Sequence, residues 1–149
     1  MLPHIWRTAA HDKVMSGYNL FLRCNMAVFD DAYHINDYSH LHMSRGRLEF
    51  PQSLQLVKYG KGKIYLKWKN VLPPTSLRMS DRLHAVWLDG KGDFSLHILA
   101  VPEVSRRDEE AMLPLPEAGS EELHLYVYFS NKEENQFSPD RYFYLPATE

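Results

Sequence analysis

The chain has 149 residues, enough for one domain, or a domain with an appendage, to bury roughly two-thirds of its unfolded surface. An apolar content of 44% with a net charge of only −2 excludes an intrinsically disordered chain. The single cysteine, Cys24, excludes an intrachain disulfide and a site built from several thiolates.

The first 31 residues are predicted to form a helical segment. Pro3 suits the first position of a short helical turn that has Ile5 and Trp6 on its apolar side. From Asp12 onward, apolar residues recur every three or four positions, as along one side of a helix: Met15, Tyr18, Leu22, Met26 and Phe29. A helix this apolar must pack on another part of the chain.

Residues 32–51 are predicted to connect this segment to a β-rich domain that spans residues 52–149. Leu41 and Met43 alternate with polar residues, and we expect them to form a short strand that ends at Gly46. Pro51 then marks the entry to the β-rich domain.

The β-rich domain is predicted to contain seven short strands at intervals typical of a sandwich. They are expected at residues 54–58, 62–69, 82–88, 94–101, 111–115, 123–130 and 141–145. In the second of them, strict alternation places Ile64, Leu66 and Trp68 on one buried face. Seven short antiparallel strands bury themselves most readily as two packed sheets. The fold class is therefore predicted to be mainly β, a seven-stranded antiparallel sandwich with the helical segment packed on it.

Two segments of the β-rich domain resemble parts of a known domain. The first is Ile-Tyr-Leu-Lys-Trp at residues 64–68, followed by Pro73 and Pro74. The second is the Tyr-rich run at residues 123–131, followed by Phe-Ser-Pro and a last strand. On these features, residues 52–146 resemble a fibronectin type III domain, one form of the immunoglobulin-like sandwich. The resemblance implies that the third, sixth and seventh strands share a sheet.

A second resemblance covers most of the chain. It rests on residues 18–22, on Asp-Tyr-Ser at residues 37–39, on Ser-Arg-Gly-Arg-Leu at residues 44–48, and on the two strands quoted above. Together these segments resemble an uncharacterised family of gut-bacterial proteins. No activity, substrate or catalytic residue is established for that family, so the resemblance implies a layout of the chain and no site.

Aromatic residues are expected on the outer face of one sheet. If the apolar residues at alternate positions of the third, sixth and seventh strands point into the core, the residues between them point outward. The outward set is His84, His124, Tyr126, Tyr128, Tyr142 and Tyr144, together with Val86. This face is too aromatic to meet only water. Our preferred interpretation is that the N-terminal helix covers it; the alternatives are a protein partner, a second copy, or a ligand such as a sugar ring.

A basic stripe is expected on the outer face of the other sheet. It consists of Lys58, Lys61, Lys63, Lys67 and Lys69, with Tyr65 among them. Residues 1–69 carry 10 Lys and Arg against 5 Asp and Glu, whereas residues 70–149 carry 7 against 14. Lysines beside an aromatic residue can bind nucleic acid or acidic glycans. A lysine-rich face also keeps a sheet soluble, and we prefer that interpretation.

Four polar side chains cluster in the connector: His34, Asp37, His40 and His42. His40 and His42 would share one face of a short strand, and such a pair can bind a metal. A metal site also needs further ligands and an outer shell, and this spacing is not a recognised ligand set. We therefore expect surface or capping histidines and no cofactor.

The sequence favours a non-enzymatic binding or protein-interaction module, a monomer or weak homodimer, with a protein or glycan partner. The first alternative is a binder of polyanions or nucleic acid that uses the basic stripe. The second is a metal-dependent enzyme that uses the connector histidines. No apolar run approaches the roughly 18 residues that cross a bilayer, and no basic region followed by an apolar block begins the chain, so we expect a cytoplasmic protein.

Overall fold

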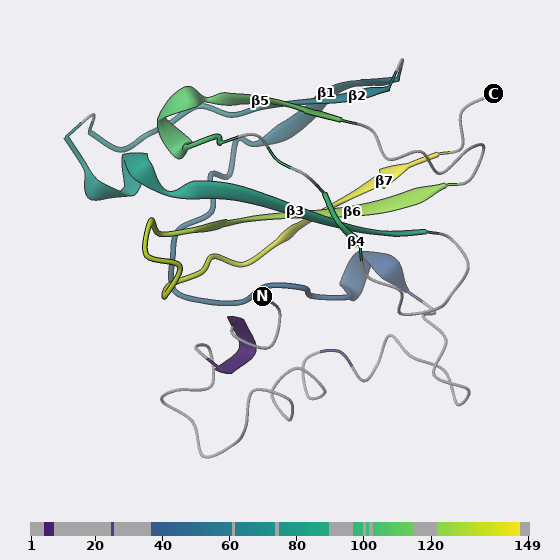
Figure 1. Ribbon diagram of the computed structural model, residues 1–149, viewed down its shortest axis with the longest axis horizontal. Coiled ribbons are helices and arrows are strands. Elements are labelled where there is room, and N and C mark those ends of the chain that lie inside the picture. The colour runs from purple at the N-terminus through teal and green to yellow at the C-terminus, as the bar shows by residue number, and fades with distance from the viewer. Residues whose placement is uncertain are drawn as a thin grey trace.

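The computed structural model describes residues 5–7, 25, 37–60, 62–73, 75–89, 97–99, 101, 103–114 and 122–146. Seven strands in these residues form two antiparallel sheets (Figure 1). One sheet has the order β1-β2-β5, with β1 at Gln55–Gly60, β2 at Lys63–Lys67 and β5 at Glu110–Pro114. The other has the order β4-β3-β6-β7, with β4 at His97–Ile98, β3 at Arg82–Asp89, β6 at Leu123–Ser130 and β7 at Arg141–Leu145. Short 3-10 helices are η2 at Tyr38–His40, η3 at Leu77–Ser80 and η4 at Arg106–Asp108.

This arrangement confirms the predicted seven-stranded antiparallel sandwich of the fibronectin type III kind. The third, sixth and seventh strands share one sheet, as that resemblance implied. The fourth strand pairs with the third rather than joining the first sheet. Most strand ends lie within one or two residues of their predicted positions, and of the predicted fourth strand only residues 97–98 are assigned to β4.

The main core lies between the two sheets. Inward-facing residues of β2 and β5, such as Ile64, Leu66 and Leu113, are fully buried and pack against Leu125 and Phe129 of β6. Trp68 lies one residue past the end of β2, so it is not in the strand, yet it is buried as predicted. Its ring meets Phe129 edge-on at 5.7 Å between centroids, which closes one end of the core.

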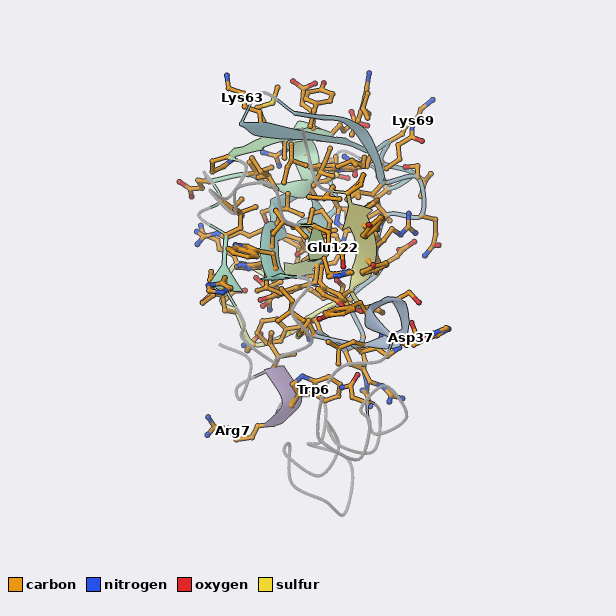
Figure 2. All side chains as sticks on the ribbon, turned by 90° about the vertical axis from the view of Figure 1, so that its right-hand side faces the viewer. Trp6, Arg7, Asp37, Lys63, Lys69 and Glu122 are labelled. Carbon is orange, nitrogen blue, oxygen red and sulfur yellow. The ribbon has the colours of Figure 1, made fainter. Side chains whose placement is uncertain are left out.

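A second, smaller core covers the outer face of the β3-β6-β7 sheet. Its buried residues are Ile5, Trp6, Leu41, Met43, Val86, Leu88, Tyr126, Tyr128 and Phe137. Residues 5–7 are helical, and the burial of Ile5 and Trp6 confirms the apolar side predicted for the first helical turn. Figure 2 shows Trp6 below the sandwich, on the side opposite Lys63 and Lys69.

The strand expected at Leu41 and Met43 is not formed, although both side chains are buried. Backbone groups there bond to side chains from elsewhere in the chain rather than to a neighbouring strand. Asn25 accepts from the His42 backbone N–H at 2.6 Å and donates to its carbonyl at 3.1 Å. Asp140 accepts from the Met43 N–H, and the Trp6 indole N–H donates to the Met43 carbonyl. The expected strand was therefore wrong, because these side chains take the place of a partner strand.

Most of the predicted apolar helix falls outside the described residues. Asn25 is the exception, and it is helical and fully buried. The division into segments at residues 31 and 51 stays a prediction. Among the described residues, no helix combines the length and apolar character that a membrane crossing needs.

Candidate functional site

The aromatic residues predicted on one outer face do come together. In the sheet register, His84 lies opposite Tyr128, His124 opposite Tyr144, and Tyr126 opposite Tyr142. The chain's own residues cover most of this face: Tyr126 and Tyr128 are 0% and 1% exposed, whereas Tyr144 remains 49% exposed. The cover comes from the connector as well as from residues 5–6, so the centre of the face is an internal packing surface and not an open platform.

His124 lies at the centre of a polar cluster on this covered face. The Tyr38 ring stacks on its imidazole at 3.6 Å between centroids, and its Nδ1 shares a hydrogen bond with the Tyr142 hydroxyl at 2.7 Å. Its Nε2 lies 3.6 Å from Glu122, which in turn accepts a hydrogen bond from the Tyr144 hydroxyl. Burial raises the pKa of Tyr142 to about 12, so this phenol keeps its proton at neutral pH. The cluster therefore fastens the connector to the sheet and does not supply a phenolate base or nucleophile.

His84 lies beside a serine and a carboxylate, but without the geometry of a catalytic triad. Its Nε2 lies 2.7 Å from the Ser130 hydroxyl and 4.0 Å from Glu134. A triad needs the carboxylate on the second ring nitrogen, Nδ1, whereas both groups here approach the same nitrogen. The imidazole also stacks on Tyr128 at 5.2 Å. Ser130 is fully buried, so its hydroxyl cannot reach a substrate.

Burial lowers the pKa of His84, which predicts a loss of stability in mild acid. The unfolded histidine has a pKa of about 6.5, so below that pH the unfolded state binds a proton that the folded state resists. The contribution of His84 to the free energy of unfolding should therefore fall as the pH drops below about 6.5, whereas the raised pKa of His42 acts in the opposite direction. Between pH 8 and pH 5.5, urea unfolding should show that the unaltered protein loses more stability, or gains less, than His84→Gln does. Equal differences in the two proteins would contradict this assignment.

The basic stripe forms on the outer face of the β1-β2-β5 sheet. Lys63, Lys67 and Lys69 are exposed, and Figure 2 shows Lys63 and Lys69 pointing away from the sandwich. Lys61 and the side chain of Lys58 lie outside the described residues. The Tyr65 hydroxyl donates to the Glu110 carboxylate at 2.7 Å, and Glu110 lies opposite Lys67 in the register. A carboxylate therefore lies within the stripe, which the sequence pattern did not predict.

The connector histidines separate into two pairs. Asp37 caps η2 by accepting from the Ser39 N–H, and its carboxylate also accepts from the Ser39 hydroxyl and contacts the His40 ring. The bond from the Ser39 hydroxyl, followed by the contact with His40, lowers the pKa of Asp37. His42 pairs with Asp140 at 3.2 Å, which raises the pKa of His42. His40 lies in a 3-10 helix, so the expected strand face shared with His42 is wrong. His34 lies outside the described residues, and nowhere in the described part of the chain do three such side chains meet to hold a metal ion.

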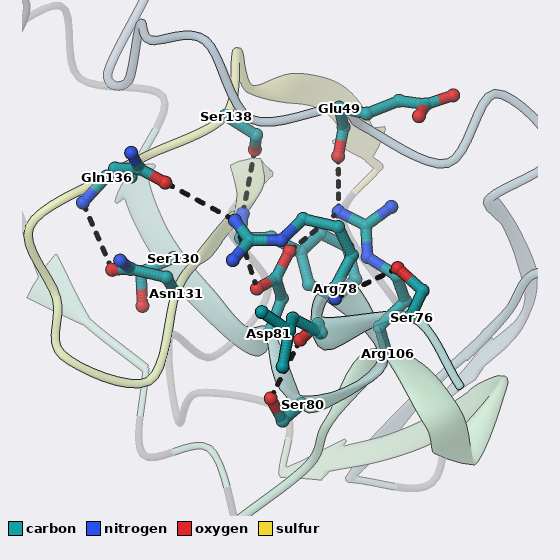
Figure 3. Close-up of polar contacts among 12 residues, drawn as sticks. Glu49, Ser76, Arg78, Ser80, Asp81, Arg106, Ser130, Asn131, Gln136 and Ser138 are labelled. Carbon is teal, nitrogen blue, oxygen red and sulfur yellow. Dashed lines mark hydrogen bonds and ion pairs between the residues drawn. The ribbon is translucent and has the colours of Figure 1, made fainter. Parts of the chain in front are cut away.

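The sequence did not predict a buried charge cluster at one end of the sandwich (Figure 3). Its residues come from three loops: the one between β2 and β3, the one between β4 and β5, and the one between β6 and β7 (Figure 1). Asp81 and Arg106 are 1% and 2% exposed and lie 3.4 Å apart. Arg78 approaches the other oxygen of Asp81 at 3.7 Å and donates to Gln136 in the loop between β6 and β7. Arg106 also lies over the Phe129 ring at 4.9 Å and donates to the Glu49 carbonyl. The cluster joins the three loops to the end of the core.

The loop between β2 and β3, which carries Arg78 and leads to Asp81, also presents two exposed aliphatic side chains. Val71 is 86% exposed and Leu77 is 81% exposed. The backbone on either side is held: Asn70 donates to Glu109 and to the Arg106 carbonyl, and Ser76 caps η3. Rigid loops at the end of a sandwich are a common place for recognition residues. We call the described residues 70–73 and 75–78 the recognition loop.

Neither a known protein-family model nor a curated protein matches the chain. Among solved structures, it is similar to the chicken CNTN1 FN1-FN3 domains, with 13% identity and a TM-score of 0.48 over 70% of this chain and 33% of that one. It is also similar to the Twitchin kinase region from C. elegans, with 16% identity and a TM-score of 0.42 over 68% of this chain and 17% of that one. The chain thus spans about a third of the first structure and about a sixth of the second.

Proposed function

We propose that this protein is a non-enzymatic protein-interaction module that contacts its partner through the recognition loop. The observation that carries the proposal is the exposure of Val71 and Leu77, at 86% and 81%, on a loop held in place by buried charges. An exposed apolar side chain gains free energy when a partner covers it, and the hydrogen bonds that hold the backbone at Asn70 and Ser76 reduce the conformational entropy lost on binding.

The chemistry of the polar clusters supports a binding role over a catalytic one. His84 receives both its serine and its carboxylate on one nitrogen, and the pKa of Tyr142 is raised rather than lowered. A catalytic nucleophile needs a base on one side and a group that orients the base on the other. Asp37 acts as a helix cap, which accounts for it without a metal.

The polyanion alternative has weaker support in the geometry. Lys63, Lys67 and Lys69 of the basic stripe are exposed on the outer face. However, Glu110 lies beside Tyr65, where a stacked base would have to sit. That carboxylate lowers the net positive charge that the closely spaced phosphates of a nucleic acid would meet. The relation to the gut-bacterial family stays a prediction.

The proposal can be tested by site-specific photo-crosslinking in cells that express the full chain. A photoreactive amino acid at position 71 or 77 is expected to give a discrete protein adduct. Ile98, an aliphatic residue that is 72% exposed on β4, is the matched control position. The double variant Val71→Ser/Leu77→Ser should keep its free energy of unfolding within about 0.5 kcal/mol, because neither side chain is packed, and should lose association with the captured protein. Adducts of equal yield at positions 71, 77 and 98 would refute the proposal.

A further inference from the structure

The outer face of the β1-β2-β5 sheet carries an apolar row across its three strands. Tyr65 occupies the centre of β2 and lies opposite Met112 of β5, which is 48% exposed. On β1, the residue paired with Tyr65 is Lys58, and the register shifts between Leu56 and Lys58. Val57 lies at this shift and is 51% exposed. Two half-exposed aliphatic side chains thus flank a tyrosine on a face that the described part of the chain leaves open.

Positive charge borders this row along the strand direction. Lys63 and Lys67 lie two residues before and two residues after Tyr65, and all three share the outer face because side chains alternate along a strand. Lys69 adds a third exposed cation beyond the end of β2. Glu110 adds one negative charge beside them, which its hydrogen bond from the neutral Tyr65 hydroxyl does not remove. Three exposed lysines against this one carboxylate still leave the described part of the face with an excess of positive charge.

The hydrogen bond to Glu110 also gives the tyrosine a fixed direction. It holds the phenol oxygen 2.7 Å from the carboxylate and raises the pKa of Tyr65, so the hydroxyl stays protonated and neutral. A neutral ring held between two lysines is a preformed contact surface, which reduces the entropy lost when a partner binds.

We propose that this face binds an extended acidic protein segment with the pattern acidic–x–apolar–x–acidic. Residues four apart on a strand lie about 13 Å from each other, and an extended segment places its own residues at the same spacing. Two carboxylates of the segment then meet Lys63 and Lys67, while its apolar residue covers Tyr65 and the row from Val57 to Met112. Charge complementarity selects the acidic partner, and the apolar row selects a polypeptide over a polyanion. This surface is separate from the recognition loop, so the two proposals stand or fall independently.

The test uses the full chain and a fluorescein-labelled peptide that contains Glu-Ser-Leu-Ser-Glu, followed by fluorescence anisotropy. Binding is expected at about 50 mM salt and should weaken clearly at about 300 mM, where the screening length is much shorter. The variant Lys63→Glu/Lys67→Glu should weaken it by about tenfold or more, since two attractive charge contacts become repulsive. Lys132→Glu, on the loop between β6 and β7, is the matched charge control and should bind as the unaltered protein does.

Three outcomes would overturn the proposal. One is no binding of the peptide at about 50 mM salt. Another is equal binding of a peptide in which lysines replace both glutamates. The third is tighter binding of oligo-dT or heparin than of the peptide, lost in Lys63→Glu/Lys67→Glu, which would assign the face to polyanions. Val71→Ser/Leu77→Ser should bind the peptide normally, so a failure of the recognition-loop proposal is distinguishable from a failure of this one.

Discussion

Replacing Gly46 with alanine is expected to destabilise the protein by about 3 kcal/mol, because the new methyl group has no room. A Cβ built on Gly46 would lie 1.9 Å from the carbonyl oxygen of Phe137 and 2.7 Å from its carbonyl carbon. Both atoms belong to the backbone, so no side-chain rotation can relieve the clash. The connector would have to move away from residues 137–138. That movement would break the hydrogen bond from Leu48 N–H to the Phe137 carbonyl, 3.1 Å, and the one from the Ser44 hydroxyl to the Ser138 carbonyl, 2.7 Å.

Gly62 provides the matched control for Gly46→Ala. Nothing lies within 4 Å of a Cβ built there, but its φ of +78° is left-handed. Gly62→Ala should therefore cost only about 1–2 kcal/mol, the strain of an L-residue in that conformation. Urea denaturation of both variants gives the comparison. A Gly46→Ala variant that is no less stable than Gly62→Ala would show that the connector does not need this close approach.

These contacts give a physical role to residues 44–48, one of the segments on which the whole-chain resemblance rests. The Ser44 hydroxyl donates to the Ser138 carbonyl, and the Leu48 N–H donates to the Phe137 carbonyl. Gly46 has no side chain, which lets its backbone approach the backbone of Phe137. Within the described residues, this motif fastens the connector to the loop that leads into β7. It is thus a structural motif, and the two proposed interaction surfaces lie elsewhere.

The sandwich could be predicted from the sequence because a strand with one buried face shows apolar and polar residues in alternation over a few consecutive positions. The alternation of Ile64, Leu66 and Trp68 with lysines is visible in eight consecutive residues, and the Tyr-rich run at β6 is as regular. The same alternation correctly separated His84 from Leu83 and Ala85, whose side chains lie in the main core. Periodicity predicts which side of a strand is covered.

Periodicity does not predict which part of the chain packs on the covered side of a strand. The wrong prediction of a strand at Leu41 and Met43 follows from this limit. Asn25 meets the His42 backbone across 17 positions, and Trp6 meets Met43 across 37. No local pattern marks a side chain that takes the place of a strand partner, so a strand was expected at Leu41 and Met43. The burial of Tyr126 under the connector depends on the same long-range contacts.

The predicted strand positions imply a loop between the second and third strands, but the buried charges beside it were missed for a related reason. Residues 105–110 resemble an ordinary solvated loop, since arginine and aspartate are seldom fully buried unless paired. Arg106 becomes buried only because Asp81, 25 positions earlier, lies 3.4 Å away. Val71 and Leu77 fall in that loop, but the sequence does not show that their apolar side chains stay exposed.

The buried charge cluster leads to the second large effect that we expect. Asp81→Ala should lower the free energy of unfolding by about 3–5 kcal/mol, because it leaves the buried guanidinium of Arg106 without its counter-ion. Burial raises the pKa of the Asp81 carboxyl more than its two arginines lower it, and burial also lowers the pKa of Arg106. Both pKa shifts favour the neutral form, so burying either charge costs free energy. The attraction between the two side chains offsets part of that cost.

A surface pair and a double variant separate this effect from a general loss of charge. Glu103 pairs with Arg82 at 3.6 Å but is 84% exposed, so Glu103→Ala should cost at most about 1 kcal/mol. Asp81→Leu/Arg106→Met removes both buried charges and should recover most of the stability lost in Asp81→Ala, since an apolar pair of similar volume avoids the desolvation cost. Thermal and urea unfolding of the three proteins measure these differences. If Asp81→Ala and Glu103→Ala cost the same, the cluster does not hold the loops, and other contacts must hold the backbone of the recognition loop.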